Sequence, residues 1–262
     1  MTEWRFIDAG PCSAAMNMAT DEALARSVRK GASPPVLRVY EWTTPSVSIG
    51  CFQKIEAVNL PYCAKMHIPV VRRPTGGRAV LHDDELTYSF SAQTGEGPFS
   101  KGLMDSYRQI SRAFCRAISV LGPATEARTT RDHGGAPKNP LCFHSVSFAE
   151  ITVLNRKLVG SAQKRWRDGL LQQGSIPYEP RETLTRKVFG IDASIDLTER
   201  MIGLKEVVPD LDPARFREAV RRSFEETFGV VLTPSALSGE ESLHASELEV
   251  RKYLSRAWTF QE

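Results

Sequence analysis

The segment RRPTGGRAVLHD combines residue types that can hold a polar ligand. Gly76 and Gly77 lack a Cβ atom, so main-chain N–H groups beside them can approach a ligand closely. Arg72, Arg73 and Arg78 can supply positive charge for a carboxylate or a phosphate. A hairpin with a Gly-Gly turn and solvated arginines explains the same composition equally well, because short glycine-rich patterns are weak evidence.

The polar neighbours of the two glycines add to this candidate site. Thr75 precedes the glycines, and His82 follows them, just before Asp83. The pair His82 and Asp83 can form local hydrogen bonds. We predict that His82 shapes the wall of a pocket, and the sequence gives little support for a role in proton transfer.

A candidate nucleophile lies further along the chain. Cys142 follows a loop rich in Gly and Pro, and Lys157 lies fifteen positions later. If residues 148–154 and 158–162 form a hairpin, the chain folds back and can bring Lys157 near Cys142. A nearby ammonium favours the reactive thiolate, and the same lysine can exchange protons with a thiol or an amine. Taken alone, Cys142 is more typical of a cysteine that packs in the core.

The remaining cysteines are interpreted as structural. Cys51, Cys63 and Cys115 lie among apolar residues and are predicted to pack in the core. Cys12 has no partner at a suggestive spacing. The five cysteines are odd in number and include no CxxC pair, so we predict neither a disulfide framework nor a metal site.

Hydrophobic periodicity predicts the elements that must position these residues. Apolar alternation favours strands, at residues 4–8, 36–42, 46–49, 69–72, 78–81, 86–92, 148–154, 158–162 and 170–177. Helical spacing of apolar residues favours helices, at residues 14–29, 60–66, 103–121, 212–228 and 239–256. The predicted fold class is α+β, with a mixed β-sheet and flanking helices. Residues 1–205 are expected to form a catalytic domain, with a helical C-terminal segment, 206–262, packed on it.

The composition limits the classes of function that the sequence supports. The 262 residues include 34 basic and 31 acidic side chains, for a net charge of +3. Such a small excess does not favour nucleic-acid binding, which usually needs a strongly basic surface. No signal-peptide pattern and no long apolar run is visible, so a cytoplasmic protein without a membrane span is expected.

Several motifs, in order, resemble the superfamily of lipoate and biotin protein ligases and octanoyltransferases. These are the opening WRFIDAG and NMATDEAL, the segment RRPTGGRAVLHD followed by ELTYSF, then RKLVGSAQKR, and finally QQGSI. The resemblance implies the biotin/lipoate protein ligase-like fold and a tunnel for an acyl chain. The substrate-binding residues it implies are Arg72, Arg73, Thr75, Gly76, Gly77, Arg78, His82, Gly160, Ser161 and Ala162.

Within this superfamily the chain looks most like the octanoyltransferases that load the glycine cleavage H protein. Their thioester cysteine lies in a "CF" segment fifteen residues before the lysine of the RK motif, as Cys142 and Lys157 do here. Arg78 agrees, since the ligases more often have a third glycine there. His144 departs from the pattern, which has an acidic residue after "CF". The resemblance implies transfer of octanoyl from acyl carrier protein to the H protein or another lipoyl domain, with no cofactor.

Two other functions remain open. An ATP-dependent lipoate–protein ligase would use ATP and Mg²⁺, with Arg72, Arg73, Lys157 and Lys164 holding the carboxylate and phosphates. A non-catalytic binder of a lipoylated or biotinylated domain would bind its carrier tightly without turnover.

Overall fold

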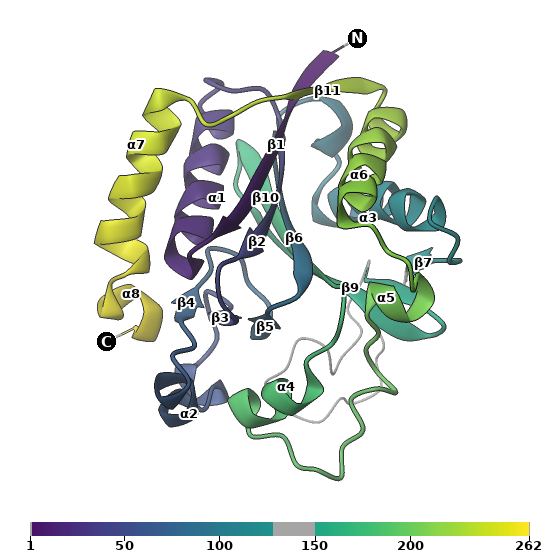
Figure 1. Ribbon diagram of the computed structural model, residues 1–262. Coiled ribbons are helices and arrows are strands. Elements are labelled where there is room, and N and C mark those ends of the chain that lie inside the picture. Colours follow the sequence, from purple (N-terminus) through teal and green to yellow (C-terminus); the bar gives the residue numbers. More distant parts are fainter. Residues whose placement is uncertain (1, 128–149, 262) are drawn as a thin grey trace.

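The structure, a computed structural model, describes residues 2–127 and 150–261 and contains two β-sheets (Figure 1). The main sheet has the order β11-β1-β2-β6-β10-β9-β8-β7. Its strands, in that order, are Val230–Pro234, Thr2–Cys12, Val36–Trp42, Glu85–Gln93, Gly169–Pro177, Arg156–Arg165, Ile151–Val153 and Glu126–Ala127. The small sheet has the order β4-β3-β5, with strands Val70–Arg72, Ser46–Ile49 and Val80–His82.

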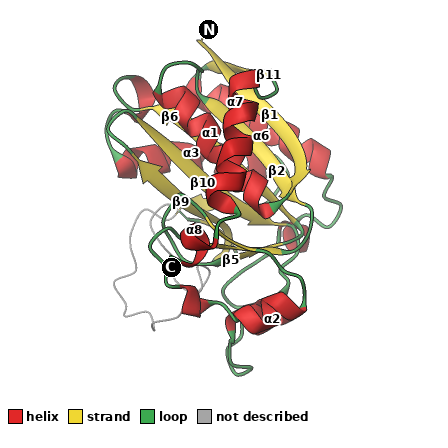
Figure 2. Cartoon of the chain, turned by 90° about the vertical axis from the view of Figure 1, so that its left-hand side faces the viewer, coloured by secondary structure: helices red, strands yellow, loops and turns green. Residues whose placement is uncertain are grey.

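Helices cover both faces of the main sheet. The α-helices α1 to α8 span Ala14–Arg29, Leu60–Lys65, Leu103–Ser119, Glu182–Phe189, Leu204–Val207, Pro213–Phe228, Gly239–Leu248 and Arg256–Phe260. Short 3-10 turns lie at Ile55–Ala57 and Gly97–Phe99, and a π-helical turn lies at Glu249–Tyr253. Figure 1 shows α1 on one side of the sheet with α7 outside it, and α3 and α6 on the other side. The view in Figure 2 places α7 in front of the sheet.

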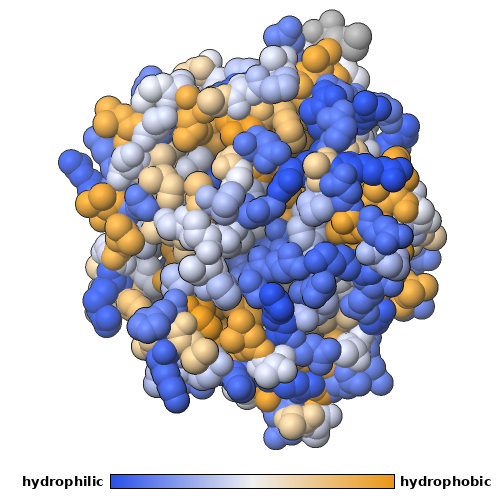
Figure 3. Space-filling model, viewed as in Figure 1, coloured by the Kyte–Doolittle hydropathy of each residue, from blue (hydrophilic) through white to orange (hydrophobic). Residues whose placement is uncertain are grey.

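The two faces of the main sheet carry different side chains. Phe90, Phe114 and Phe224 are fully buried in the large apolar core under α3 and α6. The α1 face carries a smaller apolar cluster around Tyr40 and Trp42 and many buried polar groups. Apolar side chains lie mostly inside, and in Figure 3 the exposed ones form separate small patches among hydrophilic residues. The α1 face is therefore the face whose polar side chains can bind a ligand.

Most predicted elements are confirmed, and several details differ. The strands on either side of the glycine turn do not pair with each other, because β3 lies between them, parallel to β4 and antiparallel to β5. The helix predicted at 239–256 is interrupted by the π-helical turn and by Ser255. Strand β11, which pairs in parallel with β1, and the two-residue strand β7 were not predicted.

No described helix is long and apolar enough to span a membrane.

The C-terminal segment is fastened to α1 by one buried carboxylate. Glu22 accepts hydrogen bonds from Lys252, at 2.6 Å, and from the Tyr253 hydroxyl, and it also pairs with Arg26. Burial alone would raise the pKa of Glu22, but these hydrogen bonds and charges outweigh it and lower the pKa below its ordinary value. The charged form of Glu22 therefore holds the chain end against α1.

A backbone contact fastens the glycine turn. A Cβ atom added to Gly50 would lie 2.0 Å from the carbonyl oxygen of Gly77, whereas one added to Gly76 would meet nothing within 4 Å. Gly77 itself has φ of +88°, a conformation that glycine adopts without strain. Gly50 is thus required for the close approach of the turn to the end of β3.

Glu22→Gln is expected to lower the free energy of unfolding by about 2 kcal/mol, because hydrogen bonds to a charged group are lost. The pKa of Glu22 is lowered in the folded protein, so its contribution is complete above the ordinary glutamate pKa of about 4.3 and fades as the pH falls through the folded value. Urea denaturation at several pH values measures this. Glu226→Gln, which removes an exposed partner of Arg116, is the control and should change stability by less than about 1 kcal/mol. An equal loss in both variants would contradict the assignment.

Gly50→Ala is expected to lower the free energy of unfolding by about 3 kcal/mol, because the new methyl group overlaps main-chain atoms that cannot rotate away. The matched variant Gly76→Ala should stay within about 1 kcal/mol of the wild type. Urea denaturation of both proteins is the measurement. If Gly50→Ala were as stable as Gly76→Ala, the close approach of the turn would be wrong.

Candidate functional site

Four adjacent strands arrange their side chains in rows across the α1 face of the sheet. One row runs from β2 through β6 and β10 to β9 and consists of Tyr40, Thr87, Ser175 and Gly160. Side chains two residues apart on a strand share a face, so the next row lies beside it: Arg38, Ser89, Gln173 and Ala162. With neighbouring strands about 4.8 Å apart, each row spans roughly 14 Å.

A pocket, here called the central pocket, lies on these rows. The strands form its floor, and Met18 of α1 lies over it together with residues of the small sheet. Tyr40 and Trp42 lie at the β2 end of the pocket, and small residues of β9 lie at the other end. The lining residues are Met18, Tyr40, Trp42, Ser48, Arg73, Val80, His82, Thr87, Gly160, Ser161, Ala162, Gln173, Gly174 and Ser175.

Half of the predicted substrate-binding residues line this pocket. They are Arg73, His82, Gly160, Ser161 and Ala162. The others, Arg72, Thr75, Gly76, Gly77 and Arg78, are absent from its lining. The glycine turn nevertheless adjoins it, since a Cβ atom added to Gly77 would lie 3.5 Å from the Cβ of Ala162. The two motifs therefore meet at the β9 end of the central pocket.

Two predicted ligand-binding arginines are used to hold the chain in place. Arg72 donates to the carbonyl oxygens of Gly50 and Gln53, at 2.9 and 2.7 Å. Arg73 donates to the carbonyl oxygens of Gly76 and Arg78, at 2.7 Å each. Both side chains are almost fully buried. The hydrogen bonds of Arg73 hold the glycine turn and those of Arg72 hold residues 50–53, whereas the sequence suggested positive charge for an anion.

Asp21 of α1 connects three of the sequence motifs. Its carboxylate accepts hydrogen bonds from Arg38, Tyr40, Ser89 and Gln173, at 2.6 to 2.8 Å. The side-chain oxygen of Gln173 in turn accepts from the hydroxyl of Thr75, at 2.8 Å. The helix, the floor of the pocket and the glycine turn are thus joined by one chain of hydrogen bonds. Sequence analysis missed Asp21, although it lies within the NMATDEAL motif.

A second buried network supports the wall that contains His82. The imidazole stacks on Trp42, with ring centroids 4.1 Å apart, and its two nitrogens contact Ser48 and Glu85 at 2.7 Å each. Glu85 also accepts hydrogen bonds from Thr87 and Ser175. His82 is therefore a fixed part of the pocket wall, which agrees with the role predicted for it. Trp42 was missed, although the alternation of β2 places it on the same face as Tyr40.

Two buried phenols, Tyr40 in the pocket lining and Tyr88 in the large core on the other face of β6, are unsuited to act as bases. Burial and the neighbouring Asp21 carboxylate hold the pKa of Tyr40 well above its ordinary value. Burial raises the pKa of Tyr88 to about 12. Both phenols therefore stay protonated near neutral pH.

Lys157 lies in the predicted hairpin, which is confirmed for its described part. Strands β8 and β9 pair in antiparallel fashion around Leu154 and Asn155, both of which have positive φ. The buried ammonium of Lys157 forms an ion pair with the equally buried Glu150. Cys142 and His144 lie outside the described residues. Sequence analysis missed Glu150, because a single acidic residue in a strand gives no signal of its partner.

Two other cysteines are poor candidates for a nucleophile. Cys63 is buried and Cys115 packs half-buried against the large core. Burial raises the pKa of both thiols, which disfavours the thiolate. Cys51 is also buried, so the predicted packing role of these three cysteines agrees with the structure.

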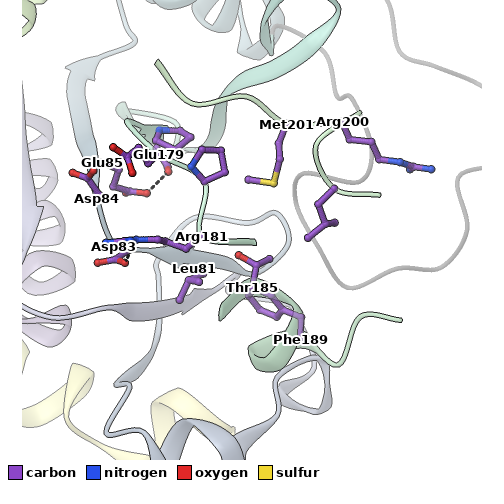
Figure 4. A pocket seen from close by; sticks show the side chains of 14 residues that line it. Leu81, Asp83, Asp84, Glu85, Glu179, Arg181, Thr185, Phe189, Arg200 and Met201 are labelled. Atoms are coloured by element: carbon purple, nitrogen blue, oxygen red, sulfur yellow. Dashed lines mark hydrogen bonds and ion pairs between the residues drawn. The ribbon is translucent and has the colours of Figure 1, made fainter. Parts of the chain in front are cut away.

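A second pocket, here called the side pocket, continues along β10 from the central pocket (Figure 4). Ser175 lines both pockets, and Pro177, two positions further on the same face, lines only the side pocket. Its lining residues are Leu81, Asp83, Asp84, Glu85, Ser175, Pro177, Glu179, Pro180, Arg181, Thr185, Phe189, Leu197, Arg200 and Met201. Main-chain hydrogen bonds join Lys157 to Arg200 and to Ile202, so one wall lies directly beside Lys157.

The part of the chain that the structure describes contains no group of three or more His, Cys, Asp or Glu side chains that could hold a metal ion.

Comparison with solved structures supports the fold and relates the chain to lipoate-binding proteins. A T. acidophilum protein assigned to the lipoate protein ligases, solved with bound lipoic acid, superimposes with a TM-score of 0.83 and 25% identity over 100% of both chains. A lipoate-protein ligase A bound with ATP gives a TM-score of 0.83 and 25% identity, covering 99% of each chain.

Comparison with known sequences gives full-length relatives. An octanoyltransferase LipM of Geobacillus kaustophilus is 35% identical and covers 98% of both chains, and one of Kyrpidia tusciae is 36% identical and covers 100% of both. The family model described as the lipoyl protein ligase A/B catalytic domain matches residues 13–225. By the match to this model and by its full-length relatives, the chain belongs to the lipoyl protein ligase A/B catalytic domain family.

Proposed function

We propose that this chain is an octanoyltransferase of lipoate biosynthesis in the cytoplasm. It takes an octanoyl group from acyl carrier protein as a thioester on Cys142 and transfers it to a lysine of a lipoyl-accepting carrier, such as the glycine cleavage H protein. The observation that carries the proposal is the central pocket, which crosses four strands from an aromatic end at Tyr40 and Trp42 to small residues of β9. The full-length relatives named octanoyltransferases favour the same activity.

The shape of the central pocket suits a straight acyl chain. A narrow space about as long as three strand spacings accepts an unbranched chain lengthwise. The methyl end of the acyl group lies against Trp42 and Met18, where it loses contact with water. The carbonyl group then lies at the β9 end, where the glycine turn can offer main-chain N–H groups to a developing oxyanion. Lys157 is three residues before Gly160 on this strand.

The proposed transfer has two balanced steps. The Cys142 thiolate attacks the donor thioester, a new C–S bond forms, the donor C–S bond breaks, and the donor thiol leaves with the proton that Cys142 gave up. The acceptor lysine then attacks the enzyme thioester, a C–N bond forms, the C–S bond breaks, and a proton returns to the cysteine sulfur. Lys157 carries the proton in both steps. Its ion pair with Glu150 fixes the position of its ammonium.

The alternative is an ATP-dependent lipoate–protein ligase. The structural similarity to a ligase bound with ATP favours it. The observed hydrogen bonds of Arg72 and Arg73 to main-chain carbonyls weigh against a phosphate-binding role for them. We therefore place this alternative second and propose that the transfer needs no ATP.

Incubation with octanoyl-acyl carrier protein, without ATP, is expected to add one octanoyl group to the protein, as measured by intact-mass spectrometry. Cys142→Ala should abolish the adduct, because the nucleophile is removed. Cys51→Ala, at a buried cysteine near the glycine turn, is the control and should keep the adduct. A wild type that gains no mass, or a Cys142→Ala protein that does, would contradict the proposal.

Glu150→Gln is expected to lower the free energy of unfolding by about 3 kcal/mol, since it removes the carboxylate that faces a buried ammonium. The double variant Glu150→Gln/Lys157→Met should recover most of this stability and yet transfer octanoyl about 100-fold more slowly than the wild type. Urea denaturation and a transfer assay measure the two effects. A stable double variant with wild-type transfer would exclude Lys157 from the reaction.

A further inference from the structure

The side pocket has the composition of a site for a lysine side chain. Leu81, Phe189, Leu197 and Met201 supply apolar surface, which the methylene stem of a lysine can cover. Figure 4 shows Asp84, Glu85 and Glu179 grouped on one side of the pocket, with Asp83 near Leu81. Apolar walls with carboxylates at the edge match the two parts of a lysine, its stem and its ammonium.

The charges at this pocket favour a cation over an anion. The lining contains four carboxylates and two guanidinium groups. Arg181 is already paired with Asp83, at 2.7 Å, and Figure 4 shows the guanidinium of Arg200 pointing away from the carboxylates. Lys205, which contacts two of these carboxylates, adds a third positive charge, so the excess is one negative charge. A phosphate group of the acyl donor would meet this excess at close range. A cationic side chain would be attracted instead.

These carboxylates already hold one lysine of the protein itself. Lys205 lies 3.0 Å from both Asp84 and Glu179, and these hydrogen bonds raise its pKa above the ordinary value. The contacts use one oxygen of each carboxylate, as does the pair between Arg181 and Asp83. The second oxygens of Asp83, Asp84 and Glu179 have no partner among residues 2–127 and 150–261, and they can accept a further ammonium.

The location links the side pocket to the reaction. It begins at Ser175, which also lines the central pocket, and follows the same face of β10. Its opposite wall, at Arg200 and Met201, is joined to the main chain of Lys157. A lysine side chain lying in it would therefore approach the carbonyl end of an acyl chain that occupies the central pocket.

We propose that the side pocket receives the acceptor lysine of the carrier protein, whose ammonium is oriented by Asp83, Asp84 and Glu179. One of these carboxylates takes a proton from the ammonium, and the neutral amine then attacks the thioester carbon. This assignment rests on the acyl transfer proposed above. It gives the two substrates separate approaches, because the donor must reach the nucleophile while the acceptor enters beside β10. It also predicts that the pocket carboxylates affect the acceptor half of the reaction and leave the donor half unchanged.

The test separates the two half-reactions. Wild type, Asp83→Asn, Glu179→Gln and the double variant are first octanoylated with octanoyl-acyl carrier protein, and the adduct is followed by intact-mass spectrometry. The octanoyl-proteins are then mixed with the apo H protein over a range of concentrations. Glu199→Gln, which neutralises an exposed carboxylate outside the side pocket, is the matched control. Urea denaturation confirms that each variant is folded.

The double variant is expected to be octanoylated at the wild-type rate and to need roughly tenfold more carrier for half-maximal transfer. Each single variant should show a smaller increase, and Glu199→Gln none. Hydroxylamine is an uncharged amine, so it should cleave the octanoyl-thioester of every variant at the wild-type rate. This result would show that the thioester itself is intact and accessible.

Two results would overturn the assignment. If the variants accept the octanoyl group more slowly and transfer it normally, the side pocket binds part of the acyl donor. If carrier dependence is unchanged, no cation binds there. A wild type that forms no adduct but modifies the carrier with ATP would refute the proposed transfer separately, and the carrier dependence of that ATP-driven reaction would still test the side pocket.

Discussion

The buried carboxylate of Asp21 is the contact on which the candidate site depends. It lies in α1, yet its hydrogen-bond donors belong to β2, β6 and β10, and through Gln173 it reaches Thr75 in the glycine turn. Moving a carboxylate out of water costs several kcal/mol unless donors surround it. Four donors supply that compensation only when the helix and the three strands have one relative position. The same position creates the floor of the central pocket.

Sequence patterning predicted most of the elements but few of the contacts between them. The alternation of apolar residues along β2, β6 and β10 and the helical period of α1 and α3 are local properties. They predicted these strands and helices correctly. The order of the strands depends on register between distant segments, so the row from Tyr40 to Gly160 could not be derived from periodicity. The same limit explains why periodicity could not place β3 between β4 and β5.

Residue types indicated residues that line one pocket, but they did not indicate the contacts that these residues make. Arg72 and Arg73 were interpreted as positive charge for a ligand, yet Arg72 donates to carbonyl oxygens just after β3 and Arg73 donates to those of the glycine turn. Guanidinium groups serve both purposes, and only geometry distinguishes them. Glu150 gave no sequence signal and the alternation that includes Trp42 did not indicate its role, because the importance of both residues comes from partners that the fold brings close. The motifs are informative together because one hydrogen-bonded network joins them.

The central claim is that an acyl group crosses from a thioester on this protein to a carrier lysine without activation by ATP. A chase experiment tests it most directly. Isolated octanoyl-protein is mixed with the apo H protein in the absence of ATP and free octanoate, and both proteins are weighed by mass spectrometry over time. The account predicts that the octanoyl mass leaves the enzyme and appears on the carrier in equal amount. An octanoyl-protein that stays inert, with carrier modified only after free acid and ATP are added, would contradict it.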